Sequence, residues 1–251
     1  MEPEIQKLDG GIRKQNSWPV LRKAMVSDYL KEGMRIVITG GPASEPIDQV
    51  RFITNQSTGE LATTLAQCFS VAGHDVELFL GSGASWRPKT AAYFQTNEDL
   101  EGLLRNVRER GRVDAVLHAA ALSDFGVSRV SVSGGILTAA KLSSDAERIE
   151  LLLVPKPKLI RRLRELFSQA YIVGWKFELE GTPAEVVQEG VEQIRRNQTN
   201  ACVVNGSAFG PAFGFCTDQG LIRTLATKEA LSHWLLEVVG GAVLGAEDGK
   251  R

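Results

Sequence analysis

The loop that runs from Gly40 to Gly59 carries the residues best suited to binding an anion. Gly40 and Gly41 allow a ligand to approach the backbone closely, and their amides are free to bind negative charge. Asn55, Ser57 and Gly59 lie where a helix is predicted to begin, and a helix N-terminus also attracts anions. For Ser57 and Gly59 alone, a capped helix after an irregular loop is the alternative. Two such features on one loop predict a phosphate-binding site.

Further candidates follow the third predicted strand. Ala120 and Ala121 are small enough for a ligand to lie against their backbone, and Asp124 would place a carboxylate in the cleft. The sequence around Asp124 is equally compatible with a helix cap or a turn.

Three longer side chains could reach the same cleft. Lys141 could meet phosphates as a mobile point charge, although a lone lysine is usually a solvated surface group. Trp175 ends a late strand and could stack on a base, although core packing is the commoner fate of an aromatic ring. Arg196 ends a helix, where a cation favours the helix dipole in any case. We expect these side chains and Asp124 to converge on one edge of the sheet.

Strand-like and helical segments alternate along the chain, which predicts an α/β fold with a doubly wound, mainly parallel Rossmann-like sheet. In such folds, ligands bind outside the carboxyl ends of the strands, near the point where the strand order reverses. The predicted strands are 35–39, 75–80, 114–121, 149–154, 171–175 and 201–205, with a hairpin over 213–225. The predicted helices are 59–72, 97–110 with Asn97 as its cap, 157–167, 183–197 and 228–239.

The length of 251 residues predicts one domain with additions. We expect an N-terminal extension over residues 1–33 with a possible short helix over Leu21–Leu30, one domain over 34–239, and a flexible tail over 240–251. The segment Gly126–Ala140 is strand-like and too long for a simple connection, so we interpret it as an inserted β-flap.

Composition excludes several classes of protein. The formal charge is 29 − 30 = −1, so the whole-protein field favours neither nucleic acid nor an anionic membrane. No apolar run is long enough to predict a spanning helix, and the polar N-terminus does not resemble a signal peptide. The cysteines Cys68, Cys202 and Cys216 lack the spacing of a zinc site, which favours reduced thiols in a cytoplasmic protein.

Several common catalytic motifs are missing. Pro42 stands where a GxGxxG loop has its second glycine, and the P-loop, GxSxG and HExxH patterns are absent. No tyrosine is followed four residues later by the lysine that short-chain dehydrogenases use.

Taken together, these segments resemble the phosphopantothenate–cysteine ligase family, also called phosphopantothenoylcysteine synthetases. The resemblance covers roughly Met34 to Val239, and its most specific part is Val-Arg-x-Ile-x-Asn-x-Ser-x-Gly over Val50–Gly59. The other matching segments are Ile38–Gly41, Glu45–Gln49, Ala119–Phe125, Lys141–Ser144, Val173–Glu178 and Ala201–Asn205. The chain resembles a stand-alone form without the flavin-dependent decarboxylase half, so FMN is not expected.

The resemblance implies that a nucleoside triphosphate, CTP or ATP with Mg²⁺, activates the carboxylate of 4′-phosphopantothenate as an acyl-nucleotidylate. The amine of L-cysteine then displaces the nucleotide. It further implies that Asn55 orients the acyl-nucleotidylate, that Lys141 neutralises charge at the α-phosphate, and that Arg51, Ala120 and Ala121 bind substrate. The residues that it assigns to the nucleotide are Gly40, Gly41, Ser57, Gly59, Asp124, Trp175 and Arg196. No metal ligands are identified, and a homodimer with the flap near its interface is implied.

Two features depart from the bacterial members of the family. The lysine loop reads Lys-Leu-Ser-Ser in place of Lys-Ile-Lys-Lys, and Gly-Trp-Lys-Phe-Glu replaces Gly-Phe-Ala-Ala-Glu. Both changes are typical of the eukaryotic members, in which ATP replaces CTP. Two alternative functions stay open at this point, namely an NAD(P)-binding oxidoreductase and a non-catalytic nucleotide-binding relative.

Overall fold

The computed structural model describes residues 33–133, 135–136 and 140–248. The predicted N-terminal extension, apart from Gly33, and its possible short helix lie outside the described residues. Within the described ranges, no helix combines the length and the hydropathy that crossing a bilayer would need.

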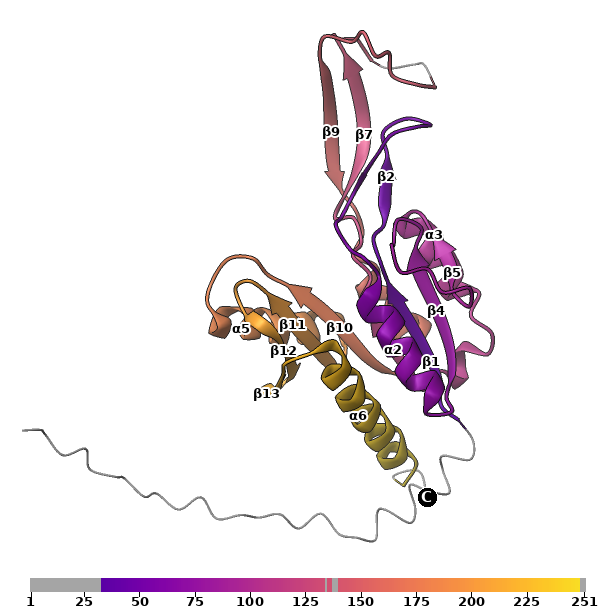
Figure 1. Cartoon of the computed structure of the whole chain (residues 1–251), viewed down its shortest axis with the longest axis vertical. Helices are drawn as coiled ribbons and strands as arrows, with labels where there is room; N and C mark the ends of the chain where they lie inside the picture. Colours follow the sequence, from indigo (N-terminus) through magenta and orange to yellow (C-terminus); the bar gives the residue numbers. More distant parts are fainter. Residues whose placement is uncertain (1–32, 134, 137–139, 249–251) are drawn as a thin grey trace, which may run out of the picture. The chain divides into compact units, whose positions relative to one another are not determined.

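An eight-stranded sheet forms the centre of the described chain (Figure 1). Its strands, in spatial order, are β13 (Gly220–Leu225), β12 (Gly210–Thr217), β11 (Ala201–Gly206), β10 (Tyr171–Phe177), β6 (Ala115–His118), β1 (Arg35–Gly40), β4 (Asp75–Gly81) and β5 (Ala92–Phe94). The strands from β11 to β5 run parallel, and β12 and β13 add an antiparallel edge. The chain winds outward in both directions from β1 and β6, so the predicted doubly wound α/β fold is confirmed.

Helices cover both faces of the sheet because the side chains of each strand alternate between two cores. In β1, Ile36 and Ile38 point to the first core and Val37 to the second. The helices α2 (Glu60–Val71) and α6 (Lys228–Asp248) pack on the first core. The opposite face carries α3 (Asn97–Arg105), the 3₁₀ turns η1 (Arg110–Arg112) and η2 (Leu159–Arg162), α4 (Leu163–Leu166) and α5 (Pro183–Asn197).

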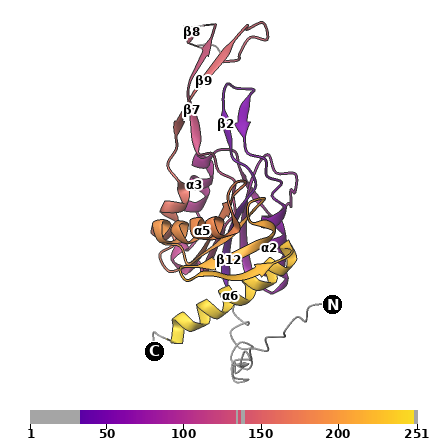
Figure 2. The ribbon, with the colours of Figure 1, turned by 90° about the vertical axis from the view of Figure 1, so that its left-hand side faces the viewer.

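A separate three-stranded antiparallel sheet, which we call the β-arm, extends beyond the end of the main sheet (Figure 2). It consists of β7 (Phe125–Val132), β8 (Gly135–Ile136) and β9 (Ile149–Pro155). The β-strands predicted for the flap over Gly126–Ala140 correspond to β7 and β8. The prediction that the strand 149–154 belongs to the main sheet is wrong. This strand is β9, and it pairs with β7. The prediction failed because an apolar run indicates a strand but does not indicate which distant strand it pairs with.

The loop between β1 and α2 contains a hairpin that the sequence analysis did not predict. Its strands, β2 (Ser44–Pro46) and β3 (Phe52–Thr54), pair in antiparallel register. The turn between them, residues 47–51, is closed by a hydrogen bond from the Ile47 amide to the Arg51 carbonyl at 2.8 Å. We call residues 44–54 the β2–β3 hairpin.

Three helical segments differ from the prediction in their bounds. Thr96, and not Asn97, caps α3, because the Thr96 hydroxyl accepts from the Asp99 amide at 3.1 Å and completes a capping box. The helix ends at Arg105 and not at residue 110. At the other end of the chain, α6 continues through the expected tail to Asp248, because Val243 packs against the same core as Val239. The predicted helix over 157–167 is a 3₁₀ turn followed by one short helix.

Candidate active site

The carboxyl ends of β1 and β6 meet where the strand order of the sheet reverses. The Ala121 amide donates to the Gly41 carbonyl at 2.9 Å, and the Ala43 amide donates to the Ala121 carbonyl at 3.0 Å. These bonds form a parallel bridge between Pro42 and Ala121. The glycine loop and the alanine segment therefore lie side by side, as a ligand site at this edge of the sheet requires.

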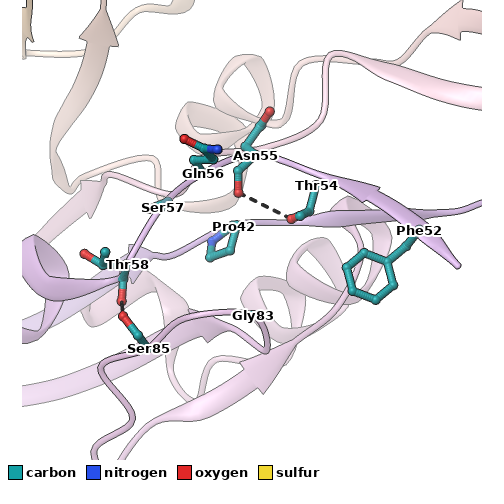
Figure 3. Close-up of a pocket in the computed structure, with 9 residues that line it drawn as sticks. All are labelled: Pro42, Phe52, Thr54, Asn55, Gln56, Ser57, Thr58, Gly83 and Ser85. Atoms are coloured by element: carbon teal, nitrogen blue, oxygen red, sulfur yellow. Dashed lines mark hydrogen bonds between the residues drawn. The ribbon is translucent and has the colours of Figure 1, made fainter.

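A depression of about 460 Å³ opens on this loop, which is within the usual size of small-molecule sites (Figure 3). Its lining residues are Pro42, Phe52, Thr54, Asn55, Gln56, Ser57, Thr58, Gly83 and Ser85. Of the predicted site residues, Asn55 and Ser57 belong to this lining. Gly83 and Ser85 come from the connection after β4, which lies at the strand ends where the fold predicts a ligand, although neither residue was among the site candidates.

The glycines of the loop let the backbone segments around the depression pack closely. A Cβ added at Gly40 would lie 2.2 Å from the Cβ of Ala62 in α2. Gly41 and Gly59 have positive φ angles of 71° and 75°, which favour glycine, and a Cβ on Gly59 would lie 2.9 Å from that of Ala84. The three glycines thus fix β1, the start of α2 and the β4–β5 connection against one another.

The first turn of α2 borders the depression. Gly59 caps the helix, and the Thr58 hydroxyl accepts from the Glu60 amide at 3.3 Å. The positive end of the helix dipole is therefore directed toward the residues that line the depression, including Ser57. Glu60 would oppose an anion here, but its carboxylate is paired with Lys228 of α6.

Asn55 joins the glycine loop to the segment after β6. Its Nδ2 donates to the carbonyl of Ala121 at 3.2 Å and to that of Leu122 at 2.9 Å. These bonds fix the plane of the amide, and no described residue donates to its Oδ1. Ala120, one residue earlier, packs against the second core of the sheet. The structure therefore places three predicted site residues, Asn55, Ala120 and Ala121, next to one another.

At the turn of the β2–β3 hairpin, Asp48 joins Arg51 to Leu142, the residue after Lys141. The Asp48 carboxylate pairs with Arg51 at 2.7 Å and accepts from the Leu142 amide at 2.9 Å. The hydrogen bond from Leu142, followed by those from Val50 and Arg51, lowers the pKa of Asp48 well below its ordinary value, although burial acts in the opposite direction. The sequence analysis missed Asp48. A signal in the sequence could have found it: an aspartate at the start of a turn often accepts hydrogen bonds from the amides two and three residues later, as in an Asx turn.

Asp124 lies at the base of the β-arm, where it forms an exposed ion pair with Lys158. Beside it, Lys156 is 12% exposed and joins Glu45 of the β2–β3 hairpin to Glu98 of α3. Asp124 therefore contributes, in this structure, to the contacts between the β-arm and the rest of the domain.

Trp175 and Arg196 are not brought to the depression. The Trp175 indole packs against the first core, and its Nε1 is buried without a hydrogen-bond partner among the described residues. Arg196 lies in the last turn of α5, where it pairs with Glu192 at 3.8 Å. Because α5 connects two parallel strands, this turn lies at the amino edge of the sheet, opposite the depression.

His118 is a buried polar residue that the sequence analysis passed over. It ends β6, and its Nδ1 is 2.8 Å from the Thr39 hydroxyl in β1. Burial lowers the pKa of His118 to about 4, so the ring is neutral at physiological pH. Thr39 and His118 thus join the two central strands directly beneath the loops of the site.

No group of three histidine, cysteine, aspartate or glutamate side chains within the described ranges could hold a metal ion. Mg²⁺ commonly binds through one or two carboxylates together with substrate phosphates and water, so it does not need such a group.

Comparison with known proteins finds relatives that are named for coenzyme A biosynthesis. The chain is 31% identical over 178 residues to the "Coenzyme A biosynthesis bifunctional protein CoaBC" of Methanocaldococcus jannaschii, covering 70% of this chain and 41% of that protein. The protein of the same name from Thermococcus kodakarensis is 30% identical, with 71% and 43% covered. The chain therefore spans less than half the length of these two curated relatives.

Solved structures share the fold. The DNA/pantothenate metabolism flavoprotein from Streptococcus pneumoniae matches with a TM-score of 0.74 at 24% identity, covering 84% of this chain and all of that one. A Cab2 variant in complex with phosphopantothenate-cysteine matches with a TM-score of 0.65 at 18% identity, covering 93% and 97%. The family model described as the DNA/pantothenate metabolism flavoprotein C-terminal domain matches residues 31–237. The chain belongs to this family.

Proposed function

We propose that the chain is a phosphopantothenate–cysteine ligase, which joins 4′-phosphopantothenate and L-cysteine in coenzyme A biosynthesis. Its curated relatives are named for coenzyme A biosynthesis, and a structural relative was solved with phosphopantothenate-cysteine. One depression lies next to the α2 N-terminus and is lined by Asn55, which is hydrogen-bonded to Ala121, and this arrangement carries the proposal because it suits a phosphorylated acyl intermediate. The family membership favours the ligase over the oxidoreductase alternative.

The reaction has two steps. The carboxylate of 4′-phosphopantothenate attacks the α-phosphorus of a nucleoside triphosphate, forming an acyl-nucleotidylate and releasing pyrophosphate. The amine of cysteine then attacks the acyl carbon, giving an amide, nucleoside monophosphate and a proton. Because the first step gathers negative charge on the phosphates, the site needs fixed donors and cations.

The glycine loop and the first turn of α2 would supply the fixed donors. Gly40, Gly41, Ser57 and Gly59 form or border the close-packed backbone around the depression. The dipole of α2 favours negative charge at this end, and pairing with Lys228 offsets the one carboxylate of the first turn.

Asn55 would orient the acyl-nucleotidylate. Its two hydrogen bonds hold the Ala121–Leu122 backbone, against which the acyl group would lie, and Oδ1 can accept from the incoming amine. Ala120 and Ala121 provide a surface without side-chain bulk.

Lys141 would neutralise charge at the α-phosphate, and Arg51 would bind the phosphate of 4′-phosphopantothenate. Arg51 pairs with Asp48 at the turn of the β2–β3 hairpin, and the residues on either side of Lys141 are hydrogen-bonded to the same turn. Asp124 and Trp175 would contact the nucleotide after rearrangement of the Lys158 pair and of the buried indole. We assign no role in this step to Arg196, which lies at the opposite edge of the sheet.

Mg²⁺ would enter with the nucleotide as part of the substrate complex. The described residues offer no group of three ligating side chains, so the polyphosphate oxygens and water would supply most of its ligands. The nucleotide would be CTP or ATP.

We further propose a homodimer formed through the β-arm. The arm exposes large apolar side chains on β7 and β9, with Phe125 53% and Leu152 47% exposed. Contiguous exposed apolar side chains favour burial against a partner. Light scattering of the purified protein measures the mass directly, and Leu152→Asp should convert a dimer into monomers. A monomer at all concentrations would contradict this part of the proposal.

Pyrophosphate release tests the proposed reaction. Purified protein, Mg²⁺ and 4′-phosphopantothenate are assayed with CTP and with ATP, each with and without L-cysteine. We expect release that requires phosphopantothenate, and amide that forms when cysteine is added. No release with either nucleotide would overturn the ligase and favour the non-catalytic relative.

Two variants test the assigned residues. Asn55→Ala and Lys141→Gln should each lower the rate of ligation about 100-fold or more, as loss of one preorganised contact typically does. Gln67→Ala, which removes an exposed amide from α2, serves as a control and should leave the rate unchanged. Unchanged ligation in both Asn55→Ala and Lys141→Gln would refute the residue assignment.

A further inference from the structure

The side chain of Asp48 is fully enclosed although it lies at the turn of a hairpin. Its Oδ1 accepts from the amides of Val50 at 2.7 Å and Arg51 at 2.6 Å. Its Oδ2 accepts from the Arg51 guanidinium at 2.7 Å and from the Leu142 amide at 2.9 Å. One carboxylate thus joins the turn of the β2–β3 hairpin to a segment more than ninety residues later in the chain.

The contacts around Asp48 hold the backbone on both sides of Lys141. On one side, the Gln49 amide donates to the Ala140 carbonyl at 3.1 Å. On the other, Leu142 donates to Asp48, and its carbonyl accepts from Arg51 at 3.2 Å. The Leu142 side chain is 2% exposed, whereas Lys141 is exposed. The backbone of Lys141 is therefore held on both sides, whereas its side chain is exposed to solvent.

We propose that Asp48 is a positioning residue that holds the Lys141 loop on the β2–β3 hairpin, so that Lys141 reaches the nucleotide from a fixed origin. This inference rests on the proposed ligase function. Because Asp48 and Asn55 belong to the same loop, Asp48 couples the lysine to the segment that lines the depression.

An ionised carboxylate suits this position better than an amide would. All four contacts come from donors, and a carboxylate has two acceptor oxygens, whereas an asparagine has one. The hydrogen bond from Leu142 heads the causes that lower the pKa of Asp48, so the group stays ionised at physiological pH. The same pairing occupies Nη1 of Arg51, whereas no described residue accepts from its Nη2 or Nε, which could bind a phosphate.

Hydrogen exchange tests the contact without reference to activity. In the full chain, the Leu142 amide should be protected, and Asp48→Asn should speed its exchange about tenfold or more. Asp48→Ser keeps a hydroxyl that can accept within the turn but cannot reach Leu142, so it should expose Leu142 while the turn amides stay protected. Asp145 is an exposed carboxylate in the same loop as Lys141, so Asp145→Asn is the matched control and should leave the exchange rate of the Leu142 amide unchanged. Unchanged exchange at Leu142 in both Asp48 variants would overturn the proposal, and amides of α5 report whether the fold is intact.

A double-mutant cycle tests whether Asp48 acts through Lys141. Asp48→Asn should lower kcat for pyrophosphate release about tenfold, and this loss should disappear when Lys141→Gln is already present. An equal loss of kcat in both backgrounds would show a general structural effect and would overturn the positioning role. If the unmodified chain releases no pyrophosphate while Leu142 is protected through Asp48, the proposed function fails and the contact itself stands.

Discussion

Replacing Gly40 by alanine tests whether the close packing of β1 on α2 shapes the site. The added Cβ would lie 2.2 Å from the Cβ of Ala62 and 3.3 Å from Cδ2 of Leu80. Carbon atoms in contact normally lie about 3.5–4.0 Å apart, so α2 would have to move away by about 1.3 Å or more. Because both neighbours are buried, neither can swing into solvent.

The expected cost is that of overpacking a core, about 1–3 kcal/mol. For a domain of this size, each kcal/mol lowers Tm by about 2–4 °C, so Gly40→Ala should lower Tm by about 2–12 °C. The shift of α2 also moves its N-terminus relative to the depression, so the affinity for nucleoside triphosphate should fall together with the stability.

Thermal unfolding followed by circular dichroism measures the first effect, and nucleotide titration the second. Gly102→Ala is the matched control, because Gly102 lies inside α3 and an added Cβ there would meet no atom within 4 Å. That variant should gain about 0.5–1 kcal/mol from helix propensity. A Tm of Gly40→Ala equal to or above that of the unmodified chain would refute the packing argument.

Two further predictions concern buried charge. The pKa of His118 is about 4 in the folded chain and near 6.5 when unfolded, so the unfolded state binds the extra proton between these values. Stability should therefore fall by up to about 3 kcal/mol as pH drops from 6.5 to 4, and denaturant midpoints of His118→Gln should lack this part of the decline. Lys156→Met should cost about 3–5 kcal/mol in urea unfolding, because it leaves the buried Glu45 carboxylate unpaired. Lys158→Met breaks an exposed pair with Asp124 and should cost under about 1 kcal/mol; equal costs would contradict the role of burial.

Features of the fold that depend on local patterns could be predicted from the sequence. The bounds of α5 agree with the prediction at both ends, and Thr182 and Glu185 form a capping box around a proline at its N-terminus. The β-branched run of β1 and its glycine stop indicated a buried strand, and the structure has one. Which strands pair with each other could not be predicted from local patterns. Residues 149–154 read as one more apolar strand, and only pairing with β7 removed them from the main sheet.

The candidate site divides in the same way. The sequence by itself determined that Gly40, Gly41, Asn55, Ser57 and Gly59 belong to one loop before a helix, because loop chemistry and helix starts are local. It also determined the family resemblance, which rests on a motif within the same loop. These residues do lie together around the depression, as their closeness along the chain requires.

Tertiary structure decided which distant residues share that loop's surroundings. It placed Arg196 at the amino edge of the sheet, because a helix between parallel strands returns the chain to that edge. It turned Trp175 into the core and enclosed Asp48 against the Lys141 loop. Such contacts depend on which strands and loops pack together across the whole domain. Local residue type and spacing do not reveal these contacts, because the packing free energy that favours them depends on the whole folded domain.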